Sequence, residues 1–365
     1  MPDTELAAWL RLTLVPGLGG QTLRKLLSEL GLPSQVLATG RPALARCVGE
    51  ALASRIVTTD NAPAVAAALR WAGTAGRAIV TLADDAYPRR LLEIPDPPAL
   101  LYVQGRTDLL ARDSLAVVGS RNATAQGIAN AESFARAFSQ AGLTIVSGLA
   151  LGIDAAAHRG ALDGTGSTVA VLGCGIDIVY PQRNADLYRA IAGRGVLVSE
   201  FPLGTPPVAD NFPRRNRLIS GLARGVLVVE AALESGSLIT ARLGAEQGRE
   251  VFAIPGSIHS PLSKGCHALI KEGAKLVESA RDLLDELAVD APTRTTAQPA
   301  PEEQHELLQH LGHDPCNVDT LCQRSGLTPD TVSAMLLQLE LAGKVASLPG
   351  GRYQRVTRGI SGEAP

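Results

Sequence analysis

Short aliphatic runs alternate with helical patterns through the middle of the chain. The runs are nearly all continuous, which is typical of strands buried on both faces of a parallel sheet. They cover residues 115–118, 144–146, 169–172, 196–198, 226–229, 251–254 and 275–277. Helical spacing of apolar residues occupies 125–140, 154–162, 184–192, 215–222, 237–247 and 266–272. This order predicts an α/β domain with an extended Rossmann-like, doubly wound and mostly parallel sheet.

A helical pattern also dominates the first part of the chain. Two short helices are expected within residues 5–30, joined by the hairpin Val15-Pro16-Gly17-Leu18-Gly19-Gly20. Such a hairpin can offer backbone N–H groups to a phosphate, but a tight helix connection without a ligand has the same sequence, and we favour the latter. We expect a helix-hairpin-helix or SAM-like module over residues 1–75. A strand at 78–82 then begins the core, expected over residues 76–290.

The last part of the chain follows a linker. Residues 291–301 read APTRTTAQPAP, a composition that cannot bury itself. Residues 302–365 are expected to form a winged-helix domain and tail, with helices at 318–324 and 329–342 and strands at 344–348 and 353–356. The second helix has no Arg or Lys before Lys344, so packing or a protein contact is favoured over insertion into a major groove.

The composition and the net charge exclude some classes of function. Of the 365 residues, 45% are hydrophobic and 19% charged, so the chain can bury a large core. Its net charge of −2 excludes a whole-molecule basic field, so a nucleic-acid site must be a local patch.

The cysteine pattern and the hydropathy predict that the protein is located in the cytoplasm. The five cysteines form no CxxC pair and are odd in number, which argues against a disulfide framework and a zinc site. No run of eighteen apolar residues occurs, and the start MPDTELAAWLRL does not resemble an export signal. We therefore expect a cytoplasmic protein with no membrane span, no metal and no cofactor.

Glycine turns follow the first three strands of the predicted parallel sheet, at 115–118, 144–146 and 169–172. Because the carboxyl ends of parallel strands meet at one sheet edge, these turns are candidate phosphate contacts. The candidates are Gly119, Ser120, Arg121, Ser147, Gly148 and Gly173. None of the turns is a G-x-G-x-x-G or Walker loop, so neither NAD nor ATP is supported. For any single loop, we favour the simpler explanation that the glycines satisfy strand-to-helix geometry.

The densest basic cluster opens one of the predicted helices. It contains Phe212, Arg214, Arg215, Asn216 and Arg217. The planar guanidinium group of arginine binds phosphate oxygens, and an aromatic ring can stack on an unpaired base. Together these residue types favour binding of a single-stranded nucleic acid. The arginines are equally explained by ion pairs with Glu200 or Glu230 on neighbouring strand ends.

A second helix start at the same edge carries hydroxyl groups. Ser235, Gly236 and Ser237 precede the helical pattern at 237–247, where they can bind phosphate or simply cap the helix.

Several distinctive blocks follow one another in the core. They include VVGSRNAT at 117–124, SGLALGIDAAAHRGAL at 147–162, VLGCGIDIVYPQRN at 171–184, NFPRRNRLISGLARGVLVVEA at 211–231 and SGSLITARLGAEQGREVFAIPG at 235–256. In this order they resemble the DNA-processing protein A family, DprA, also called Smf. The family's Gly-Ser-Arg motif falls on Gly119, Ser120 and Arg121, and its Phe-x-x-Arg-Asn-Arg motif on residues 212–217.

The resemblance implies a binding protein of natural transformation rather than an enzyme. Such a protein binds and shields single-stranded DNA, displaces single-strand-binding protein and helps load the RecA recombinase. It also implies a homodimer formed around residues 256–270, with Ile258, His267, Leu269 and Ile270 as interface candidates.

Two alternatives come from other function classes. A nucleotide phosphoribohydrolase on a related core would use Glu200 or Glu230, but the Pro-Gly-Gly-x-Gly-Thr loop of those enzymes is replaced here by Glu234-Ser235-Gly236-Ser237. Asp154 and His158 are further candidate acid–base groups, although no nucleophile–base pattern accompanies them. A transcription regulator would need duplex binding by the winged helix, which its missing basic residues disfavour.

Overall fold

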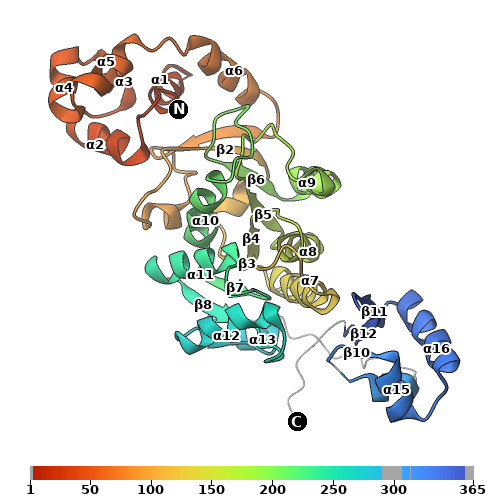
Figure 1. Cartoon of the computed structure of the whole chain (residues 1–365). Helices are drawn as coiled ribbons and strands as arrows, with labels where there is room; N and C mark the ends of the chain where they lie inside the picture. The colour runs from red at the N-terminus through yellow and green to blue at the C-terminus, as the bar shows by residue number, and fades with distance from the viewer. Residues whose placement is uncertain (1–2, 290–305, 313, 358–365) are drawn as a thin grey trace.

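A computed structural model describes residues 3–289, 306–312 and 314–357 of the chain. The chain begins with a bundle of short helices, which lies at one end of the molecule (Figure 1). These helices are α1 (Asp3–Thr13), α2 (Gly20–Leu30), α3 (Pro33–Ala38), α4 (Arg41–Val48), α5 (Glu50–Thr58) and α6 (Ala62–Ala72). Trp9, Leu12, Leu23 and Leu26 form the centre of their apolar core, which confirms the helical pattern predicted for this part of the sequence.

A nine-stranded sheet follows, in the order β1-β2-β6-β5-β4-β3-β7-β8-β9. Its strands are β1 (Arg77–Thr81), β2 (Leu100–Gly105), β3 (Ser114–Val118), β4 (Thr144–Ser147), β5 (Thr168–Val171), β6 (Val196–Ser199), β7 (Gly225–Val228), β8 (Glu250–Ala253) and β9 (Lys275–Leu276). Strands β3 to β9 pair in parallel, whereas β1 and β2 add an antiparallel edge through the pairing of β2 with β6. The predicted mostly parallel sheet is confirmed.

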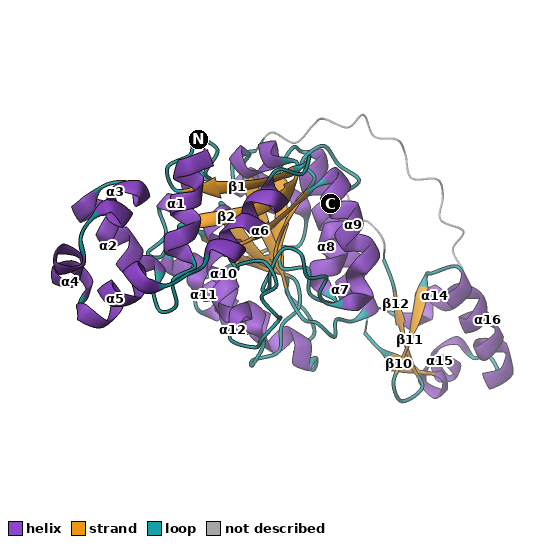
Figure 2. Ribbon diagram, turned by 90° about the horizontal axis from the view of Figure 1, so that it is seen from above, coloured by secondary structure: helices purple, strands orange, loops and turns teal. Residues whose placement is uncertain are grey.

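Helices cover both faces of this sheet (Figures 1 and 2). They are α7 (Ala125–Gln140), α8 (Ile153–Ala161), α9 (Ala185–Arg194), α10 (Asn211–Leu222), α11 (Gly236–Glu246), α12 (Lys264–Lys271) and α13 (Ala280–Glu286). Short 3-10 turns cover Arg89–Leu92, Thr107–Ala111, Gln182–Asn184 and Pro261–Ser263. Successive residues of β3 point to opposite faces, so Leu115 packs in the cluster with α7 and α8 while Ala116 packs in the cluster with α10 and α11.

Strand β3 lies at the point where the strand order reverses. The chain leaves β3 toward α7 on one face and leaves the adjacent β7 toward α11 on the other face. In open α/β sheets this divergence leaves a crevice beyond the carboxyl ends of the two strands, where ligands bind.

The final domain is a winged helix with its own core. It contains α14 (Glu306–Leu311), β10 (Cys316–Asn317), α15 (Val318–Ser325), α16 (Pro329–Leu341), β11 (Val345–Leu348) and β12 (Arg352–Arg355). Leu321, Val332 and Leu336 fill its interior. The predicted helices and wing strands are confirmed, whereas α14 and β10 were not anticipated. The predicted linker 291–301 and the tail after residue 357 lie outside the described residues.

One helix differs from the sequence-based expectation. The helix predicted over 215–222 begins at Asn211, so Phe212 and Arg214 lie in its first turn and not in the loop before it. Proline at the third helical position, Pro213, is compatible with this because the first amides of a helix have no intrahelical acceptor. Among the described residues, no helix is long and apolar enough to cross a membrane.

Candidate nucleic-acid interface

A cavity of about 820 Å³ opens beyond the carboxyl ends of β3 and β7. Its walls come from the loop after β3, the first turn of α10 and the start of α11. The residues that matter for the argument below are Ser120, Arg121, Tyr180, Phe212, Asn216, Ser235, Gly236 and Ser237. The structure therefore brings together candidate residues from three separate sequence blocks.

Arg121, Tyr180 and Phe212 form a stack at this cavity. The guanidinium carbon of Arg121 lies 5.6 Å from the centre of the Phe212 ring. The rings of Tyr180 and Phe212 are 5.7 Å apart with an angle of 34° between their planes. Arg121 and Tyr180 are exposed and Phe212 is half-buried. A planar, partly exposed aromatic and guanidinium surface of this kind stacks unpaired bases.

Gly173 allows Phe212 to take this position. A Cβ atom on Gly173 would lie 2.7 Å from Cδ1 of Phe212, closer than a carbon contact permits. Gly173 is thus covered by the ring. The absence of a side chain at Gly173 gives the ring its place, and Gly173 also lines a smaller cavity of about 110 Å³ beside the ring.

Arg215 lies in the protein interior with only 4% of its surface exposed. Its Nη1 donates hydrogen bonds to the backbone oxygens of Gly148 (2.7 Å) and Val171. Burial lowers the pKa of Arg215 to about 10, and the Asp154 carboxylate opposes that shift. Arg215 therefore joins the ends of β4 and β5. It lies at the wall of the cavity, as expected, but its Nη1 is already engaged by the two backbone oxygens.

Two more candidate positions are closed by packing. A Cβ on Gly148 would lie 2.6 Å from the guanidinium group of Arg215. Ser147 is fully buried, and its hydroxyl donates to the backbone oxygen of Val117 at 2.6 Å. The Ser147 hydroxyl is thus used inside the protein. Gly148 is buried against Arg215, but it also lines a smaller cavity of about 110 Å³ together with Arg121 and Phe212.

Asp154 and His158 hold the same turn. The Asp154 Oδ2 accepts from the amide of Gly148 at 3.1 Å, and burial raises the pKa of this carboxyl against the influence of Arg215. The His158 Nε2 accepts from the amide of Leu149 at 3.2 Å, and its Nδ1 lies 2.7 Å from the Thr168 hydroxyl. Burial lowers the pKa of His158 to about 3, so its imidazole is neutral. Both groups are used in positioning the turn.

The residues of the Gly119-Ser120-Arg121 motif differ in their exposure and in what they contact. A Cβ on Gly119 would lie 2.6 Å from Cγ1 of Ile153, so this glycine serves close packing of α8 against β3. The Ser120 hydroxyl accepts from the amide of Asn122 at 3.1 Å and lies at the cavity wall. Of the three motif residues, Arg121 is the exposed one.

The start of α11 forms the wall facing the stack. The Ser235 hydroxyl caps α11 and lies 2.7 Å from the Ser237 hydroxyl. Nothing lies within 4 Å of a Cβ placed on Gly236. Asn216 reaches across from α10, with its Nδ2 at 3.5 Å from the Gly236 oxygen. The predicted cap is confirmed, and hydroxyl groups and an open backbone remain at the cavity.

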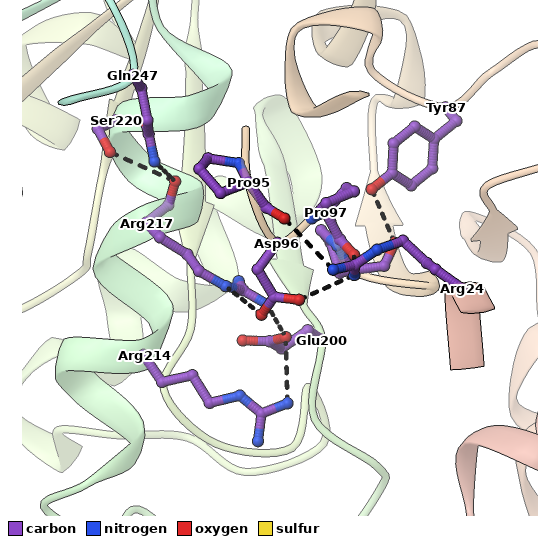
Figure 3. A network of polar contacts seen from close by, with 11 residues as sticks. Arg24, Tyr87, Pro95, Asp96, Pro97, Glu200, Arg214, Arg217, Ser220 and Gln247 are labelled. Atoms are coloured by element: carbon purple, nitrogen blue, oxygen red, sulfur yellow. Dashed lines mark hydrogen bonds and ion pairs between the residues drawn. The ribbon is translucent and has the colours of Figure 1, made fainter. Parts of the chain in front are cut away.

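Arg214 and Arg217 lie away from this cavity, in a network of ion pairs (Figure 3). Arg217 donates to Glu200 Oε2 at 2.7 Å and to Asp96 at 3.3 Å. Arg214 lies 3.5 Å from the same Glu200 oxygen. The alternative of ion pairing with Glu200 is therefore confirmed for both arginines. Glu230 instead accepts from the hydroxyl and amide of Thr124.

The structure adds Tyr180 to the candidate residues. Tyr180 follows β5 in the same loop block as Gly173, and it is an exposed aromatic residue at the edge where ligands are expected. Its place after the third predicted strand was the available signal in the sequence. Among the described residues no group of His, Cys, Asp and Glu could hold a metal ion.

The four residues predicted at the dimer interface differ in their burial. Ile258 is 66% exposed, and His267 and Ile270 are half-buried. Leu269 is 5% exposed because it packs in the core beneath α12. A partner chain can therefore touch the first three residues, whereas Leu269 supports the surface from inside.

The fold and cavity define a Rossmann-like core that carries an exposed aromatic and guanidinium surface, joined to a helical module and a winged-helix domain. Residues 78–288 match the family model described as DNA recombination-mediator protein A, and residues 291–351 match the DprA winged helix domain. The chain belongs to this DprA family, as the resemblance in its sequence blocks predicted.

Relatives and solved structures agree with this assignment. Protein Smf of Escherichia coli is 40% identical over 369 residues, covering 98% of this chain and 97% of the relative. The X-ray structure of DprA from Streptococcus pneumoniae matches with a TM-score of 0.69 and 40% identity, covering 77% of this chain and 97% of that one. A DprA structure from Helicobacter pylori, described as showing a single-stranded DNA binding mode, matches with a TM-score of 0.54 and 30% identity, covering 59% and 97%.

Proposed function

We propose that this chain binds single-stranded DNA in the cavity beside β3 and β7. The observation that carries the proposal is the exposed stack of Arg121, Phe212 and Tyr180 at the edge of an 820 Å³ cavity. A base can stack on this surface only when it is unpaired, because a duplex keeps both base faces covered. The helix α11 start, with Ser235 and Ser237, faces the stack and suits a backbone phosphate.

The proposal extends to a role in natural transformation. In this role the protein shields incoming single strands, displaces single-strand-binding protein and helps load RecA, as a homodimer. Family membership supports the role, and the exposed Ile258 near α12 supports a contact between copies. Two linked sites would raise the effective concentration of each for a long strand, so tight binding does not require a basic whole-molecule charge.

We also propose that the chain is not an enzyme. Both carboxylates of the hydrolase alternative are engaged in the fold, Glu200 with Arg217 and Glu230 with Thr124. Neither lines the 820 Å³ cavity. Incubation with AMP should release no adenine above the rate without protein, and base release that disappears in Glu230→Gln would establish the hydrolase instead.

Oligonucleotide binding by fluorescence anisotropy tests the main proposal. We expect single strands to bind and a duplex of the same length to bind much more weakly. Phe212→Ala and Tyr180→Ala should each weaken single-strand affinity about five- to a hundredfold, since stacking on an aromatic side chain contributes about 1–3 kcal/mol per base. Tyr180→Phe keeps the ring and should bind like the wild type. Equal affinity of Phe212→Ala and wild type would reject this site.

A recombinase assay tests the transformation role separately. Strand exchange by RecA on a single strand already covered by single-strand-binding protein should start faster when this protein is added. Phe212→Ala should lose that effect. Acceleration that persists in Phe212→Ala would show that recombinase loading does not depend on the cavity.

A further inference from the structure

A second cavity, of about 400 Å³, lies between the helical module and the core. We call it the module–core cleft. One wall is the α1–α2 hairpin, including Gly17, Gly19 and Gly20, and the others come from the 96–100 segment and from α10. Arg214 and Arg217 line the module–core cleft but not the larger cavity, whereas Phe212 lines the larger cavity but not the cleft.

The charges beside the cleft do not balance. Arg24, Arg214 and Arg217 share the carboxylates of Asp96 and Glu200 (Figure 3). Three guanidinium groups against two carboxylates leave one positive charge. A phosphodiester group of DNA carries one negative charge, which would neutralise the network.

Hydrogen bonding in the network is also incomplete. Nη1 of Arg217 is buried without an acceptor, and Oε1 of Glu200 is buried without a donor. The Glu200 side chain is only 4% exposed, so its free oxygen lies in the interior wall of the cleft. A buried polar group without a partner destabilises the folded state, and such groups often mark the place of a missing ligand or water. A phosphodiester oxygen can accept from Nη1 of Arg217, whereas Oε1 of Glu200 needs a donor such as water.

Arg214 remains available to an incoming anion. Its side chain is 57% exposed, and its ion pair with Glu200 is long at 3.5 Å. The guanidinium carbon lies 5.4 Å from the centre of the Phe201 ring, which holds it at the cleft wall. With five N–H donors and this single ion pair, Arg214 can bind a phosphate without breaking the network.

The first turn of α10 connects the two cavities. Phe212, Pro213 and Asn216 line the larger cavity, and Arg214 and Arg217 line the cleft. We propose that a single strand stacked on Phe212 passes over this turn and places a backbone phosphodiester in the module–core cleft. The helical module is then part of the DNA-binding surface. This inference rests on the proposed function of the larger cavity.

A pair of variants at Gly19 tests the inference. Gly19 is the residue before α2, has φ −74° and ψ 162°, and has no atom within 4 Å of a Cβ placed on it. Both Asp and Asn fit this position and cap a helix well. Gly19→Asp therefore adds a negative charge to the cleft, and Gly19→Asn is its neutral control of the same shape.

The measurement is anisotropy of oligo(dT) on the full chain at several salt concentrations. With a strand of about 16 nucleotides, Gly19→Asp should bind at least about threefold more weakly than Gly19→Asn, with a salt slope reduced by about 0.7. With about 5 nucleotides, which fill only the larger cavity, the two variants should bind alike. Arg214→Gln should behave as Gly19→Asp does.

The outcomes separate this inference from the proposed function. One outcome is that Gly19→Asp and Gly19→Asn bind long strands equally while Phe212→Ala still loses binding. That result would overturn the proposed phosphate site in the cleft but not the proposed DNA site in the larger cavity. Unchanged binding by Phe212→Ala would overturn the larger cavity itself. Weaker binding of both strand lengths by Gly19→Asp would also contradict the inference, because a separate cleft predicts an effect that depends on length.

Discussion

The Arg121 guanidinium group lies over the ring of Phe212, at 5.6 Å from its centre, although three strands of the sheet, β4, β5 and β6, separate the loop after β3 from α10 in the sequence. This contact fixes a cation beside a stacking surface. A nucleotide bound there would meet both a ring face and a positive charge.

Arg121→Gln should weaken single-strand binding and reduce its dependence on salt. The reason is that one fewer phosphate is neutralised, which lowers the slope of log affinity against log salt by about 0.7. Titration at several ionic strengths measures both quantities. Arg189→Gln, which removes an exposed charge paired with Asp186 on α9, is the matched control and should leave the slope unchanged. If Arg121→Gln shows the same salt slope as Arg189→Gln, Arg121 does not contact a phosphate.

Gly173→Ala should weaken single-strand binding as strongly as a change in Phe212 itself. The added methyl would lie 2.7 Å from the Phe212 ring and must displace it from the stack. Gly193→Ala is the control, because no atom lies within 4 Å of its Cβ position in α9. Anisotropy gives the affinities, and thermal unfolding checks that both variants are folded. Wild-type affinity in folded Gly173→Ala would show that the ring position is not needed.

Arg217→Met should destabilise the fold by about 3 kcal/mol, since it leaves Glu200 buried without its closest cation. The Arg217 side chain is 12% exposed and that of Glu200 is 4% exposed, so water compensates the lost ion pair only poorly. Urea unfolding measures the free energy change. The double variant Arg217→Met with Glu200→Gln should recover part of the stability. If Arg217→Met loses less than about 1 kcal/mol of stability, the Arg217–Glu200 ion pair contributes no more than an exposed surface pair does.

Stability should fall as the pH drops below about 6.5, because His158 stays neutral in the fold. Burial lowers the pKa of His158 to about 3, whereas the unfolded residue takes up a proton near pH 6.5. Between these values only the unfolded chain binds the proton, so the free energy of unfolding decreases by up to about 1.4 kcal/mol per pH unit. Urea unfolding at about pH 5 and pH 7 should show a smaller difference in His158→Gln than in the wild type. An equal difference in both would exclude His158 as the source.

Much of the fold was predictable because burial on both faces leaves continuous apolar runs in the sequence. Helix α7 was predicted with its observed bounds, and every parallel strand was located. The antiparallel pairing of β2 with β6 could not be predicted, since the pairing partner of an apolar run is not encoded in its local pattern. The early start of α10 was missed for a related reason: its first turn is polar, and its apolar periodicity begins only at Leu218.

The candidate site was predictable by position but not by the direction of its side chains. Strand ends and glycine turns correctly located the cavity at the edge of the sheet. Four arginines were expected around it, yet Arg215 turned inward to the β4 and β5 carbonyls and Arg217 turned to Glu200. A helix directs residues one and two positions apart to different faces and residues three apart to the same face. Arg214 and Arg217 therefore both reach Glu200, whereas Arg215 between them reaches the strand carbonyls.

The order of the elements, the parallel sheet and the edge at which ligand groups gather follow from local properties of the chain, namely its periodicity and its glycine turns. Which of those groups are free depends on how distant segments pack together. Phe212 rests on Gly173, Arg215 fills the space above Gly148, and Arg217 pairs with Glu200. Each of these contacts joins residues far apart in sequence, and their burial decides whether a charge serves the fold or remains for a ligand.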